Sequence, residues 1–144
     1  MEVLAFAASV KALVDDRGGV SAEGFPMTSL QVTSFPAQVT IPLVLALYTQ
    51  GGTDYDLRRY IVATSPRGER LGTLECRWHW PDNPGSPVKF WVSAPQLPVE
   101  IQAAGVCSIG LYESLDATET DHRFPLPVFK TNPLLPPQPS PTRM

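Results

Sequence analysis

Proline and glycine interrupt this chain at short intervals, and their spacing limits what the chain can fold into. The 144 residues include 16 prolines and 10 glycines. Proline fixes φ and removes a backbone donor, while glycine weakens the interior of helices and strands. The segments between these breaks therefore favour short strands joined by turns over long helices.

The clearest periodic segment is residues 72–80, which alternates with a period of two. Such a pattern is typical of a strand with one buried face and one solvated face. We expect Trp78 and Trp80 on the buried face. The face that we expect to be buried consists of Gly72, Leu74, Cys76, Trp78 and Trp80. The polar face consists of Thr73, Glu75, Arg77 and His79.

Further strands are expected wherever apolar and β-branched residues lie between turn signals. Residues 2–14 fit either a helical stripe or a strand. We choose a strand, because residues 15–19 read as a hairpin turn and 20–25 as a returning strand. Residues 41–48 are almost wholly apolar, so we expect a strand buried on both faces, or nearly so. The remaining candidates are 27–35, 55–64, 88–93, 106–115 and 118–128.

The pattern predicts an all-β fold in a single domain. Strands at intervals of about 8–12 residues are typical of a sandwich or barrel. We expect an antiparallel two-layer sandwich or small barrel of about eight or nine strands, with no internal repeat. The domain should span residues 1–123. A proline-rich arm should follow at 124–144, for which polyproline II or disorder is expected.

The charge and the hydropathy of the chain argue against nucleic acids and membranes as partners. The net charge is −3 and the pI about 5.3, without the basic face that nucleic-acid binding needs. No run approaches the ~18 apolar residues of a membrane span, and no signal peptide is recognisable at the start of the chain. We expect a cytoplasmic protein, or a virion protein if it is phage-encoded, with no membrane partner.

No motif for catalysis, a cofactor or a metal stands out. Cys76 and Cys107 are expected to be small buried hydrophobes rather than a disulfide. A nucleophilic site could combine Cys107, Ser108, Asp121 and His122, but such sites depend on geometry that a sequence cannot give. We therefore expect no catalytic, cofactor-binding or metal site. The turn acids considered for calcium, which match no metal-loop pattern, are Asp15, Asp16, Asp54, Asp56 and Asp82, with Asn83.

Four residues are candidates for an interface. In 88–93 we expect Val88, Phe90 and Val92 to face inward, which would leave Trp91 exposed. Phe129, Leu134 and Leu135 make the start of the arm apolar, so the arm could cross the domain or reach a neighbouring subunit. The candidate interface residues are thus Trp91, Phe129, Leu134 and Leu135.

Several segments together resemble an uncharacterised family of short bacterial and phage proteins, a domain of unknown function, over residues 2–116. The resemblance implies a β-sandwich and carries no functional residues. It lies in the opening strand and in five further segments: Asp15–Gly19, Gly24-Phe25, Ile41–Leu47, Pro98–Ile101 and Gly105–Tyr112.

Two classes of function follow from these expectations. The leading hypothesis is a non-enzymatic binding or assembly module that acts through sheet edges and the C-terminal arm, for example a phage or particle structural subunit with a protein partner or self-association. The alternative is a small-ligand binding protein or hydrolytic enzyme with a site in a barrel mouth. That alternative requires a polar cavity that gathers His122, Asp121 or tyrosines.

Overall fold

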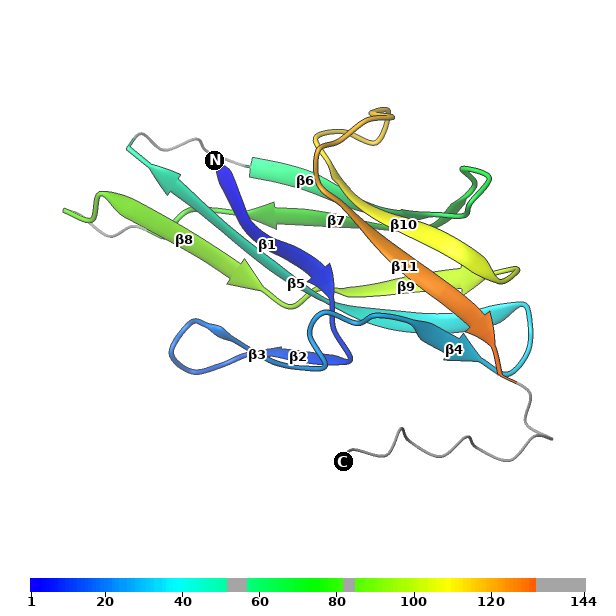
Figure 1. The fold of residues 1–144 in the computed structure, drawn as a ribbon. Coiled ribbons are helices and arrows are strands. Elements are labelled where there is room, and N and C mark those ends of the chain that lie inside the picture. The colour runs from blue at the N-terminus through cyan, green and yellow to red at the C-terminus, as the bar shows by residue number, and fades with distance from the viewer. Residues whose placement is uncertain (52–56, 82–84, 132–144) are drawn as a thin grey trace, which may run out of the picture.

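The computed structural model describes residues 1–51, 57–81 and 85–131, in which eleven strands and no helix occur (Figure 1). No helix within these ranges could cross a membrane. The strands are β1 (Glu2–Ala8), β2 (Lys11–Val14), β3 (Val20–Glu23), β4 (Leu30–Val32), β5 (Ala37–Gln50), β6 (Leu57–Thr64), β7 (Arg70–Trp78), β8 (Val88–Ser93), β9 (Gln96–Ile101), β10 (Gly105–Tyr112) and β11 (Arg123–Lys130).

The strands form two main layers, which confirms the all-β sandwich prediction. One sheet is built on β5, with β1 along one edge and β8 and β9 in succession along the other. The second sheet has the order β4-β11-β10-β6-β7, antiparallel except for the β4–β11 pair. The layers also approach at their sides, where β7 contacts β9 and β1 contacts β11. The sandwich therefore resembles a flattened, partly closed barrel.

The core between the sheets is apolar and tightly filled. Leu43, Leu45 and Leu47 project from one face of β5 and are fully buried. Ile109 on β10 and Leu126 on β11 are fully buried as well and belong to the same cluster. Burying each such side chain contributes about 1.5–3 kcal/mol, so this layer of aliphatic residues dominates the stability of the fold.

The prediction that 41–48 is buried on both faces is confirmed, because the hairpin β2–β3 lies against the outer face of this sheet. Val44 and Ala46 point away from the core, yet both are buried. Strand β2 contacts β5 and β8, and its Ala12 is buried in turn. The expected strand over residues 2–14 is likewise confirmed, as β1 and β2.

The prediction for the faces of β8 is wrong. The ladder with β5 sets Trp91 opposite the core residue Leu47 and Phe90 opposite Tyr48 on the outer face. Trp91 is partly buried against the core, while Phe90 is 51% exposed. Apolar residues occupy both faces of this sheet because the hairpin covers part of the outside. Alternation alone could not tell which face is inner.

Residues 124–130, which we expected in the arm, belong to the folded domain. Strand β11 pairs with β10 from Arg123 to Val128, and its Leu126 and Val128 are buried. Leu111 N donates to His122 O, which places Pro125 and Pro127 at positions that give no hydrogen bond to β10. Alternate prolines therefore leave this ladder intact. The rest of the expected arm, residues 132–144, lies outside the described ranges.

Candidate functional site

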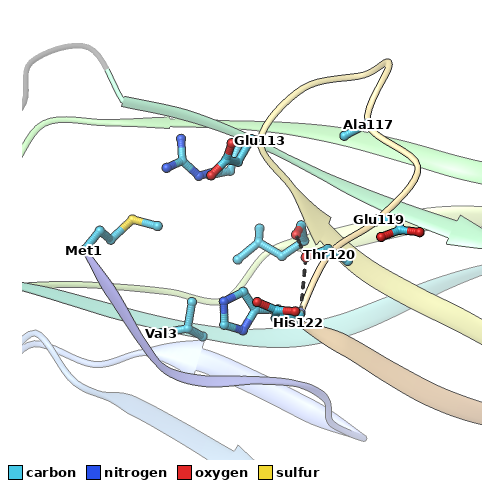
Figure 2. A pocket seen from close by; sticks show the side chains of 10 residues that line it. Met1, Val3, Glu113, Ala117, Glu119, Thr120 and His122 are labelled. Atoms are coloured by element: carbon cyan, nitrogen blue, oxygen red, sulfur yellow. Dashed lines mark hydrogen bonds between the residues drawn. The ribbon is translucent and has the colours of Figure 1, made fainter.

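A cavity of about 590 Å³ opens at the end of the sandwich beside the loop that joins β10 to β11 (Figure 2). Its volume falls within the range of about 300–1,000 Å³ that is typical of small-molecule sites. Strands β1, β6 and β10 and the loop itself contribute to the wall. The lining residues are Met1, Val3, Arg59, Leu111, Glu113, Ala117, Glu119, Thr120, Asp121 and His122.

The loop that borders this cavity is held by hydrogen bonds. Thr120 is central, because its Oγ1 donates to Leu111 O and accepts from His122 N at 3.1 Å. Arg123 Nη2 donates to Thr118 O at 3.1 Å, and Arg70 donates to Leu115 O. Side chains of the loop and of the neighbouring strands thus fix a ten-residue connection, residues 113–122. A wall of this kind is partly preorganised for binding.

The side chains around the cavity are mostly polar and carry both signs of charge. The Glu113, Glu119 and Asp121 carboxylates are exposed to solvent, and Arg59 on β6 is half-buried. Leu111 and Val3 supply an apolar floor. Such a lining can accept hydrogen bonds from a small polar ligand, whereas exposed charges give only modest affinity through each contact.

The structure brings Asp121 and His122 to this cavity, but neither Cys107 nor Ser108 lines it. Cys107 lies on the inner face of β10, where burial raises the pKa of its thiol. It is four residues from Leu111 at the cavity floor, about 13 Å along an extended strand. Ser108 points to the opposite face of β10. The constellation considered from sequence is therefore not assembled as a nucleophile–base pair.

Among the turn acids considered from sequence, Asp15 serves local structure. Asp15 Oδ1 accepts hydrogen bonds from Arg17 N at 2.9 Å and Gly19 N at 3.0 Å, which closes the β2–β3 turn. Among the described residues, no group of three or more histidine, cysteine, aspartate or glutamate side chains could hold a metal. Of the turn residues considered from sequence, Asp54, Asp56, Asp82 and Asn83 lie outside the described ranges.

Exposed apolar side chains on the hairpin and on the four-stranded sheet are further candidates for interaction surfaces. Leu13 and Val14 near the tip of the β2–β3 hairpin are 58% and 50% exposed. Phe90 on β8 is similarly exposed and meets the Tyr48 ring on β5, with ring centroids 5.8 Å apart. Large apolar side chains clustered at a surface mark interaction sites more often than single ones do.

The structure places the four interface candidates from sequence in different surroundings. Trp91 packs against the core rather than facing solvent, and Phe90 takes the outward position. Phe129 is 53% exposed on the outer face of β11. Leu134 and Leu135 lie outside the described ranges. Sequence reasoning missed Leu13 as well, although its place in a short hairpin next to a turn was a usable signal.

No family model, curated protein or solved structure matches this chain.

Proposed function

We propose that this chain is a non-enzymatic assembly module that associates with further copies of itself through its exposed apolar surface. The observation that carries the proposal is the β2–β3 hairpin, which stands outside both main sheets (Figure 1) and presents Leu13 and Val14 to solvent. One side of the hairpin packs on β5 and buries Ala12, whereas Leu13 and Val14 near the tip stay exposed. Covering these side chains with a second copy would stabilise the hairpin and bury its apolar tip.

Open sheet edges support the same function. Strand β8 pairs only with β5 among the described strands, and β3 pairs only with β2. Both therefore have a second edge that no described strand covers. Such an edge can recruit an extended segment through backbone hydrogen bonds. A phage or particle structural subunit would use both features, because symmetric assemblies repeat one contact many times.

Static light scattering of the full chain over a wide concentration range tests this function. We expect reversible self-association, weakened about tenfold or more by Leu13→Gln, because exposed apolar anchors dominate interface energies. Leu115→Gln is the matched control, since Leu115 is 41% exposed but lies in the β10–β11 loop. A chain that stays monomeric at high concentration, or equal effects of both variants, would contradict the proposal.

A second candidate function is small-ligand binding in the cavity at the mouth of the sandwich. The specific observation is the preorganised loop wall around a cavity of about 590 Å³ that gathers Asp121 and His122. A thermal-shift screen with small polar metabolites tests it, and a stabilising compound should lose its effect in Glu119→Gln. If no compound raises the melting temperature of the chain, this candidate fails.

A further inference from the structure

The segment after the last strand carries prolines at every third position. Pro133, Pro136 and Pro139 follow one another at this spacing, and the sequence of 132–144 predicts polyproline II or disorder. A polyproline II helix has three residues per turn. These three rings would therefore lie along one edge of such a helix. Segments of this kind are recognised by surfaces lined with aromatic side chains.

One surface of the described structure offers an aromatic platform of this kind. We define the platform as Tyr48 and Phe90, which lie opposite each other on β5 and β8. Their rings are 5.8 Å apart and inclined at 38°, and Phe90 is 51% exposed. The other two ring pairs in the described residues, Trp78–Trp80 and Trp78–Trp91, belong to the core. The platform is thus the described ring pair that a ligand could reach.

The tyrosine gives the platform a polar handle as well. Proline lacks a backbone N–H, so a proline-rich segment presents mainly carbonyl oxygens to its receptor. A phenolic hydroxyl can donate to such an oxygen while the ring packs on the pyrrolidine. The partly exposed Tyr48 beside Phe90 combines both properties in one small area.

The length of the tail decides which platform it can reach. Thr131 N donates to Val32 O at 2.7 Å, so the tail starts beside the end of β4. In Figure 1, β11 and β4 end at the opposite end of the molecule from the tip of β5. Strand β5 begins with Ala37 at the end of the molecule where β4 and β11 end (Figure 1). From Ala37 to Tyr48, near the other end, the distance along β5 is about 36 Å at ~3.3 Å per residue. Pro133 and Pro136 lie only about 6 and 16 Å beyond Thr131 at ~3.1 Å per residue.

We propose that the proline-rich tail, residues 132–144, binds the Tyr48–Phe90 platform of a second copy of this chain. The tail is too short to lay Pro133 and Pro136 on the platform of its own domain, so the contact joins two molecules. The proposal rests on the assembly function proposed above and names the elements that meet. A contact between two different surfaces propagates from copy to copy or closes into a ring.

The experiment titrates a synthetic peptide of residues 131–144 into the full-length chain labelled with ¹⁵N. We expect saturable amide shifts at Tyr48, Phe90 and their neighbours on β8. Phe90→Gln should weaken binding at least fivefold. Phe129→Gln is the matched control, because Phe129 is equally exposed on the other sheet and should leave binding unchanged.

Variants of the peptide test the spacing. Replacing Pro133, Pro136 and Pro139 together by alanine should abolish the shifts. Replacing Pro137 and Pro141 by alanine removes prolines from other edges and should preserve most of the binding. Equal losses from the two peptides would overturn the proposed register. Shifts centred on Phe129 or on the hairpin instead of the platform would overturn the proposed receptor surface.

The outcome is separable from that of the assembly function. If Leu13→Gln disrupts association while the peptide leaves Tyr48 and Phe90 unshifted, assembly stands and the tail–platform contact is refuted. If Leu13→Gln leaves association unchanged while Phe90→Gln weakens it and the peptide binds the platform, self-assembly through the hairpin is refuted and the tail–platform contact stands. A full chain that stays monomeric refutes both contacts between copies. Absence of both association and peptide binding refutes both.

Discussion

The indole rings of Trp78 and Trp91 stack on each other, with ring centroids 4.9 Å apart and planes 14° from parallel. Trp78 belongs to β7 in the five-stranded sheet, and Trp91 to β8 in the four-stranded sheet. Trp80 meets Trp78 edge-on at 6.0 Å. The stack is therefore a contact between the two layers at the end of the sandwich where β7 finishes.

Trp91→Ala should destabilise the domain strongly. Removing a large aromatic side chain from a packed site costs about 3–5 kcal/mol, although the partial exposure of Trp91 favours the lower end. Urea unfolding followed by circular dichroism measures this change. Phe90→Ala is the neighbouring control and should cost below about 1 kcal/mol, because Phe90 points to solvent. A larger loss for Phe90→Ala than for Trp91→Ala would contradict the assigned faces of β8.

Gly72→Ala should interfere with the approach of β7 to β9. A Cβ at Gly72 would lie 2.2 Å from Pro98 O, a backbone atom that cannot move aside cheaply. Overpacking of this kind costs about 1–3 kcal/mol. Gly19→Ala is the control, since its nearest described contact would be 3.7 Å away. Thermal unfolding of both variants measures the difference, and equal melting temperatures would argue against close packing of these strands.

Ser9→Ala should loosen the base of the β2–β3 hairpin. The fully buried Ser9 Oγ lies 2.7 Å from Glu23 O and 2.9 Å from Lys11 O, and its hydroxyl donates to these carbonyls. Losing the donor removes the hydrogen bond to these part-buried carbonyls, at a cost of about 0.5–1.5 kcal/mol. Hydrogen exchange should accelerate for amides of β2 and β3 more than for β10. Ser21→Ala, at an exposed position of β3, should leave exchange unchanged.

Thr120→Val should release the loop that borders the cavity. The hydroxyl of Thr120 links Leu111 O to His122 N, and valine keeps the shape while removing both hydrogen bonds. We expect a loss of about 1–2 kcal/mol. Limited proteolysis within 113–121 should be faster than in wild type. Thr118→Val is the control, because only the backbone oxygen of Thr118 accepts the bond from Arg123. Equal cleavage of the two variants would contradict this role.

Stability should fall at alkaline pH partly because of Cys76. Burial, and secondarily the Glu75 carboxylate, raises the pKa of this thiol from about 9.0 to about 11. The folded state then holds the proton more tightly than the unfolded state. The resulting stabilisation is fully present below about pH 9 and is lost as the pH rises to about 11.

Urea unfolding between about pH 8 and 11 measures this effect. Cys76→Ala should flatten the decline relative to wild type, because alanine has no proton to lose. The comparison of slopes separates the thiol from the lysines and tyrosines, which both proteins share. An unchanged slope in Cys76→Ala would show that this thiol does not contribute.

The sequence predicts the secondary structure well where one face of a strand is buried and the other face is exposed to solvent. The alternation in 72–80 puts Trp78 and Trp80 inside, and both are buried. The expected small buried character of Cys76 and Cys107 is confirmed as well. These positions depend on local periodicity, because a strand with one wet face must alternate. The expected eight or nine strands become eleven, because the expected strand over 2–14 is divided into β1 and β2 and because β9 is a separate strand.

By itself, the sequence determined that this chain folds as strands around an apolar core, because proline and glycine forbid long helices and a period of two remains. The tertiary structure decided which faces are inner, how far the domain extends and which groups meet. The hairpin packed over β5 covers outer-face residues of that strand, and the register between β5 and β8 turns Trp91 inward and Phe90 outward. Such contacts join segments far apart in the chain, and periodicity along one strand carries no information about what covers its outer face.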